Sequence, residues 1–255
     1  MKYSSRFFLY APLGVFLALL AIAGVHWWIL ASRLGDWLDA HNGREVMPGV
    51  TMQFAARQIT GFPFSLDTEF SDFAINVATP SGPTRWRSGK FAMHALTYGR
   101  DETIFEAAGH QRLEWTDQGR TRHILAFAVG ALHASAIVHH EGLDRFDLDL
   151  VGLGSKAFTA QRLQLHARQN AKTTQIFVTA DGLTGCARSS LRYEASLTID
   201  EAFERLQIGG ESWSDAVAAW RAAGGTARSG TNSALSSMAA DEVLNPSAVA
   251  DAACR

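Results

Sequence analysis

The chain has 255 residues, of which 47% are hydrophobic and 19% are charged, and its net charge is -2. A chain with so little net charge lacks the basic surface that attracts nucleic acid, so we expect no nucleic-acid partner. Its 22 glycines and 6 prolines suit many tight turns better than a proline-rich disordered protein.

The N-terminal segment is apolar and long. Lys2 and Arg6 are followed by no charged residue until Arg33. As a helix, the uncharged run 7–32 would be about 39 Å long, which exceeds the ~30 Å hydrocarbon core of a bilayer. Trp27 and Trp28 near its far end are typical of the membrane interface. We therefore predict a transmembrane anchor at 1–32, single-pass in the inner membrane, with a cytoplasmic N-terminus, a periplasmic body and membrane lipid as a partner.

A cleavable signal peptide is the alternative interpretation of the same segment. The Ala21-Ile22-Ala23 motif offers a small-x-small site with a cut before Gly24. The apolar run continues beyond it through Trp27 and Trp28, which favours an uncleaved anchor. Both interpretations place the body outside the cytoplasm.

A stem at 33–45 follows the anchor. Leu34, Trp37, Leu38 and His41 recur at steps of three and four residues, as on one face of a helix. This amphipathic helix would either lie on the membrane or pack on the core of the body.

Residues 46–225 form the β-rich body. Apolar and polar residues alternate with period two at 50–56, 62–70, 146–150 and 191–199. Strands with one wet face belong to antiparallel sheets, and no helical pattern separates them. The predicted fold class is mainly β: a transmembrane helix, then a curved antiparallel β-meander or two packed sheets of nine to eleven strands, and a short C-terminal helix. We expect turns at 81–83, 117–119 and 181–182.

The apolar positions change parity within one strand. Phe64, Leu66 and Phe70 share one face, whereas Phe73 and Ile75 have the opposite parity. Such a change predicts a bulge or turn near Ser71 and Asp72, because otherwise one apolar set would face water. The Phe-rich face is either an ordinary core or a groove for acyl chains, and the pattern fits both.

The end of the chain differs from the body. Asp215 lies at the start of the predicted helix, which contains Trp220 and stops at Gly224-Gly225. Residues 226–255 are rich in Ala and Ser and predict a tail of low order. Cys186 and Cys254 could pair in an oxidising compartment, and the sequence leaves this open.

A few residues could carry chemistry. They are His133, the His139-His140-Glu141 run, Asp147 and Asp149. No metal-ligand spacing or nucleophile motif accompanies them, so we interpret them as a polar turn and a wet strand face. We expect no catalytic, cofactor-binding or metal site and no cofactor, and we expect that the protein is not an enzyme.

The most distinctive motif is Gly61-Phe62-Pro63-Phe64, placed after an anchor and a first alternating strand. Gly61 permits unusual backbone angles, Pro63 suits a sheet edge or bulge, and we expect Phe62 and Phe64 to pack together on the core. The motif should therefore shape the sheet rather than touch a ligand.

With Tyr98-Gly99-Arg100 and the Trp220 to Gly225 helix end, this motif resembles the family known as domain of unknown function 2125, found in alphaproteobacterial envelope proteins. The likeness covers roughly residues 10–225. The family offers no activity to transfer, and its plan is more distantly similar to AsmA-like envelope proteins, whose β-grooves are associated with lipid transport. The resemblance implies a membrane-anchored envelope protein acting as a lipid-handling or scaffold module. The alternative is an interaction module that pairs with an unknown envelope protein through a sheet edge or the stem.

Overall fold

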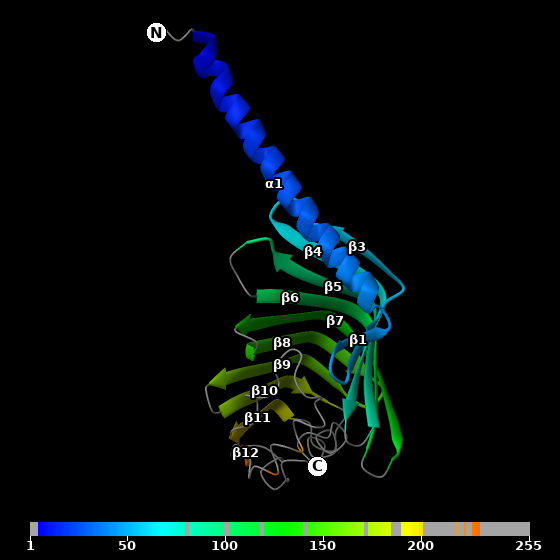
Figure 1. The fold of residues 1–255 in the computed structure, drawn as a ribbon. Helices are drawn as coiled ribbons and strands as arrows, with labels where there is room; N and C mark the ends of the chain where they lie inside the picture. The colour runs from blue at the N-terminus through cyan, green and yellow to red at the C-terminus, as the bar shows by residue number, and fades with distance from the viewer. Residues whose placement is uncertain are drawn as a thin grey trace.

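The computed structural model consists of one long helix and one antiparallel sheet (Figure 1). It describes residues 5–79, 82–98, 102–117, 120–139, 142–170, 173–184, 190–200, 218, 222 and 226–229. Trp220, Gly224, Gly225, Cys186 and Cys254 lie outside these ranges, as do most of the tail and of the predicted C-terminal helix. Those predictions therefore stay predictions.

Helix α1 (Ser5–His41) has a free half and a docked half. Among the described residues it is the one helix long and apolar enough to cross a membrane, as an anchor or a signal sequence would be. Leu13, Phe16 and Ile22 on its first half are exposed. Near its end, Leu38 is only 2% exposed and Leu34 packs beside it. Leu34 and Leu38 of the predicted stem therefore pack on the core of the body, whereas Trp37 is 45% exposed and stacks on His41.

The described strands number twelve and form a single sheet. They are β1 Arg44–Met47, β2 Val50–Gln53, β3 Ala56–Thr60, β4 Ser65–Thr79, β5 Gly82–Leu96, β6 Glu102–Thr116, β7 Arg122–His139, β8 Gly142–Ser155, β9 Thr159–Asn170, β10 Thr173–Leu183, β11 Ser190–Asp200 and β12 Ala227–Ser229. Eleven of them follow the order β1-β2-β4-β5 and then the chain order to β12. β3 pairs with residues 67–71 of β4, next to the part of β4 that pairs with β2. The antiparallel meander is confirmed, and the alternative of two packed sheets is wrong. The path through the sheet has eleven strands, within the expected nine to eleven, and the short strand β3 is the twelfth.

The long strands bend along a line that crosses the sheet, which we call the corner (Figure 1). At this line Asp72, Gly109, Gly152 and Gly182 have positive φ angles of 51°, 77°, 65° and 62°. The register shifts between β5 and β6 and between β6 and β7 fall at the same level. The parity change predicted near Asp72 is thus confirmed as one part of a bend shared by neighbouring strands.

Aromatic rings fill the apolar face next to α1. Phe73 and Phe91 stack with ring centroids 4.2 Å apart, and Phe70 lies 5.3 Å from Phe73. Leu38 of α1 and Phe54 belong to the same buried cluster. This part of the Phe-rich face is therefore a packed core.

Candidate functional site

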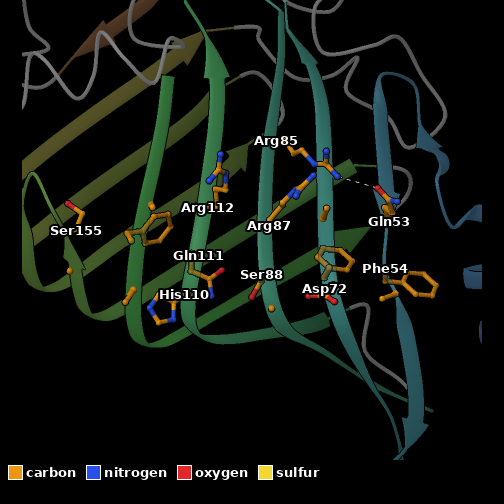
Figure 2. Close-up of a pocket in the computed structure, with 18 of the residues that line it drawn as sticks. Gln53, Phe54, Asp72, Arg85, Arg87, Ser88, His110, Gln111, Arg112 and Ser155 are labelled. Atoms are coloured by element: carbon orange, nitrogen blue, oxygen red, sulfur yellow. Dashed lines mark hydrogen bonds between the residues drawn. The ribbon is translucent and has the colours of Figure 1, made fainter. Parts of the chain in front are cut away.

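A pocket of about 770 Å³ lies beside the corner (Figure 2). This volume is within the ~300–1,000 Å³ typical of small-ligand sites. Its lining comes from six strands and the segments after β2 and β8: Gln53, Phe54, Ala55, Asp72, Phe73, Ala74, Arg85, Arg87, Ser88, Gly89, His110, Gln111, Arg112, Ala126, Phe127, Ala128, Gly154, Ser155 and Lys156. The pocket combines small residues with a group of cationic ones.

Strand register sets small and basic residues side by side. Arg87 lies opposite Ala74 on β4 and opposite Arg112 on β6, and Arg112 lies opposite Ala126 on β7. Trp86, between Arg85 and Arg87, packs against the core, so the two arginines point to the other face of β5. The alanines leave room between long cationic side chains.

Positive charge in the pocket is in surplus. Arg85 donates from Nη2 to Gln53 Oε1 at 3.2 Å, whereas its buried Nε has no hydrogen-bond partner among the described groups. Burial and the positive charge of Arg87 lower the pKa of Arg85 below its ordinary value, although Glu114 opposes this. Arg87 and Arg112 face each other across the ladder, an arrangement of like charges that is unfavourable without a counter-ion.

Glu114 does not remove this surplus. Its carboxylate accepts a hydrogen bond from Arg112 Nε at 2.6 Å and another from Arg122. These bonds lower the pKa of Glu114 to about 2. No described carboxylate forms an ion pair with Arg85 or Arg87. The pocket can therefore accept an anionic group.

Gln111 precedes Arg112 on β6, so its side chain points to the face that carries Phe127. Gln111 is 2% exposed, and its Oε1 has no hydrogen-bond partner among the described groups. Its Nε2 donates to the backbone oxygen of Ala108 at 3.3 Å.

Sequence reasoning missed this pocket. The signal was present as Arg85 and Arg87 on one face of an alternating strand, with Arg112 in the next strand. Only the register, which is offset by the shift between Ser88 and Phe91, shows that Arg87 faces Arg112. A sequence without register does not contain that information.

The residues singled out for chemistry lie on another part of the sheet. His133, Asp149 and Asp147 come together on the face opposite the core, since His133 lies opposite Asp149 and Ser135 opposite Asp147. Asp149 accepts two hydrogen bonds from Arg162, at 2.8 and 2.7 Å. The side chain of His139, and residues 140–141, are outside the description.

Neighbouring histidines and carboxylates extend this group into a row across the strands. His166 Nδ1 lies 2.6 Å from Asp147 Oδ1, and His133 Nδ1 lies 3.3 Å from Glu106 Oε1. His94 Nδ1 lies 2.9 Å from Asp67 Oδ1. Hydrogen bonds from Arg162 hold the pKa of Asp149 below its ordinary value. The row joins neighbouring strands through ion pairs. None of the described serines is hydrogen-bonded to a histidine of the row, as a serine nucleophile would be.

The Gly61-Phe62-Pro63-Phe64 motif forms the turn between β3 and β4, with a cis peptide bond before Pro63. Phe62 and Phe64 are 52% and 64% exposed, so the expectation that they pack on the core is wrong. The reason is that the turn projects beside α1 instead of folding back over the sheet (Figure 1). Of the two interface tryptophans, Trp27 contacts this turn and Trp28 is 65% exposed.

Comparison with known proteins gives one match. No curated protein and no solved structure matches the chain. A family model described as "Uncharacterized protein conserved in bacteria (DUF2125)" matches residues 27–241. The match extends beyond residue 225, where the resemblance was expected to end, and the similarity to AsmA-like proteins stays a prediction. The chain therefore belongs to the DUF2125 family.

Proposed function

We propose that this protein is a membrane-anchored envelope protein whose corner pocket binds an anionic amphiphile, such as a fatty acid or an acidic lipid. In this proposal α1 stays uncleaved in the inner membrane, its N-terminus is cytoplasmic, and the sheet lies in the periplasm. The observation that carries the proposal is the buried, unpartnered Nε of Arg85 beside Arg87 in a pocket of about 770 Å³. A buried donor without a partner costs free energy, and an acceptor on a bound anion would remove that cost.

The rest of the lining suits an apolar chain. Ala74, Ala126 and Ala128 offer hydrocarbon surface next to the arginines. A carboxylate or phosphate on Arg85 and Arg87 would form charge-assisted hydrogen bonds. This assigns the predicted lipid handling to the corner pocket rather than to the aromatic face, which is filled by its own rings.

A binding role is also proposed over a catalytic one. The histidines and aspartates of the row are engaged in cross-strand pairs, and the pocket has a cationic rather than an acid–base character. Among the described strands, the alternative of pairing through a sheet edge could use β1, β3, β12 or residues 190–196 of β11, which pair with β10 alone. β1, β3 and β12 have five residues or fewer, and such short edges favour little pairing, so this alternative would need the edge of β11.

The test begins with full-length protein purified in mild detergent. Native mass spectrometry with lipid extraction should find an acidic lipid, and titration with a fluorescent fatty acid should saturate. Arg85→Gln with Arg87→Gln should weaken the fatty-acid Kd at least about tenfold, since one charge-assisted hydrogen bond is worth more than ~1.4 kcal/mol.

Two controls separate specific binding from partition into detergent. Arg168→Gln removes an exposed arginine outside the pocket lining and should leave the Kd unchanged. A fatty alcohol of the same chain length should bind the wild type weakly and be insensitive to the double substitution. Purified protein without lipid, together with fatty-acid uptake that is equal in all variants, would refute the proposal.

A further inference from the structure

An exposed aromatic group lies where α1 leaves the body. It consists of Phe62 and Phe64 in the β3–β4 turn and Tyr98 after β5, which we call the aromatic wedge. Phe62, Phe64 and Tyr98 are 52%, 64% and 61% exposed. Phe64 and Tyr98 rings are in edge contact with centroids 6.4 Å apart. Three large exposed rings together mark a surface with a partner.

Hydrogen bonds make the wedge one rigid unit. Thr97 donates from its backbone nitrogen and from Oγ1 to the backbone oxygen of Phe64, both at 3.0 Å. The backbone nitrogen of Ser65 donates to the oxygen of Gly61 at 2.9 Å. The β3–β4 turn and the end of β5 are therefore held together, which fixes the backbone from which the exposed rings project.

The wedge is also fixed to α1 at a defined height. Trp27 Nε1 donates to the backbone oxygen of Ser65 at 2.7 Å, and the Trp27 and Phe62 rings are in edge contact at 5.8 Å. A Cβ at Gly24 would lie 3.6 Å from the Phe62 ring. The wedge thus lies alongside residues 24–27 of the helix.

That height coincides with a membrane boundary. A ~30 Å hydrocarbon core takes about 20 helical residues. Counted from Phe7, which follows the charged residues Lys2 and Arg6, the far boundary falls at about residue 27. Exposed Ile22 and Val25 lie just inside it, at 65% and 59% exposure, and exposed Trp28 lies at it.

We propose that the aromatic wedge inserts into the interfacial region of the bilayer beside α1, so that the body contacts the membrane at a second place. The occupant is the lipid surface itself, which accommodates phenol and phenyl rings at the headgroup boundary. This insertion depends on the membrane anchoring proposed above but not on ligand binding in the pocket. Two contacts on one rigid unit fix the orientation of the sheet, because a helix alone leaves the body free to rotate.

The test measures depth in full-length protein reconstituted in nanodiscs. Cys186 and Cys254 are replaced by Ser, and single cysteines at Phe64, Tyr98, Ile22 or Ile124 are labelled with the environment-sensitive dye NBD. Ile22 reports whether α1 is in the bilayer. Ile124, at 50% exposure on β7, is a matched exposed apolar position outside the wedge. Quenching by lipids spin-labelled near the headgroup is then compared.

We expect quenching at Phe64 and Tyr98 at least roughly twofold above that at Ile124, with blue-shifted emission, because the labels enter the interface. If the label at Ile22 is quenched but quenching at Phe64 and Tyr98 only equals that at Ile124, the wedge proposal is overturned and the anchor proposal stands. Blue-shifted emission without quenching, together with Phe64→Cys disulfide dimers, would overturn it in favour of a second copy. No quenching at Ile22 would overturn the anchor and the wedge together.

Discussion

The junction of α1 with the sheet and the corner pocket are built in opposite ways. At the junction, Arg57 donates to both oxygens of Asp39, at 2.8 and 2.6 Å, and Leu38 is almost fully buried. At the corner, Arg85 and Arg87 have no ion pair with a described carboxylate, and alanines leave space between them. Both regions contain arginine next to apolar residues, yet Arg57 at the junction has a carboxylate partner whereas Arg85 and Arg87 at the corner have none among the described residues.

This difference separates stability from binding. A charge with an internal partner contributes to the folded state, whereas a surplus charge costs free energy until a ligand neutralises it. Substitutions at the junction should therefore lower stability and leave ligand affinity unchanged. Substitutions at the corner should do the reverse.

The largest expected effect is that of Leu38→Ala at the junction. Removing a buried leucine side chain costs about 2–4 kcal/mol of unfolding free energy, because the helix and sheet cannot close the cavity completely. Denaturant unfolding of the full-length protein in detergent would measure it. The fatty-acid Kd, measured below the unfolding transition, should not change. Leu20→Ala on the exposed half of α1 is the control, and an equal loss there would contradict the comparison.

Period-two alternation predicted most of the fold. The patterns at 146–150 and 191–199 lie within β8 and β11, and the parity change near Asp72 located the bend. These predictions succeeded because burial of one strand face is a local property of the sequence.

Glycine in strands was the main source of error. Asp181-Gly182 was expected to be a turn but lies inside β10, where Gly182 has a φ of 62°. A Cβ there would lie 2.6 Å from Cγ of Gln161, so the site needs glycine for close strand contact as well as for its φ. Sequence alone does not distinguish a turn glycine from a strand glycine at a bend, since both have positive φ.

The candidate site was less predictable than the fold. Arg87 and Arg112 are 25 residues apart in the chain, and their pairing depends on a register shift that leaves no local pattern. Exposure of Phe62 and Phe64 depends on where the turn lies relative to α1. Both features arise from tertiary placement, which alternation does not encode.

A smaller effect compares one arginine from each region. Arg57→Gln breaks the two-point contact with Asp39 and should lower the Tm by roughly 1–3 °C. Arg87→Gln should leave the Tm unchanged or raise it slightly, since it relieves repulsion from Arg112. Differential scanning fluorimetry without ligand would measure both. A clear loss of Tm for Arg87→Gln would show that the surplus charge is satisfied within the protein.

The smallest effect concerns Glu114, a carboxylate near the corner that forms ion pairs with Arg112 and Arg122. Arg122 and Arg112 lower its pKa in the folded protein from 4.5 to about 2. Its contribution to stability is therefore fully present above about pH 4.5 and is lost as the pH falls toward 2. The Tm of Glu114→Gln should thus lie below that of the wild type at pH 6, and the gap should narrow by pH 2.5. Glu69→Gln, at an exposed glutamate of β4, should show a gap that stays small across this range. A Glu114 gap that is constant with pH would mean that its two arginines stabilise the corner by packing and not by charge.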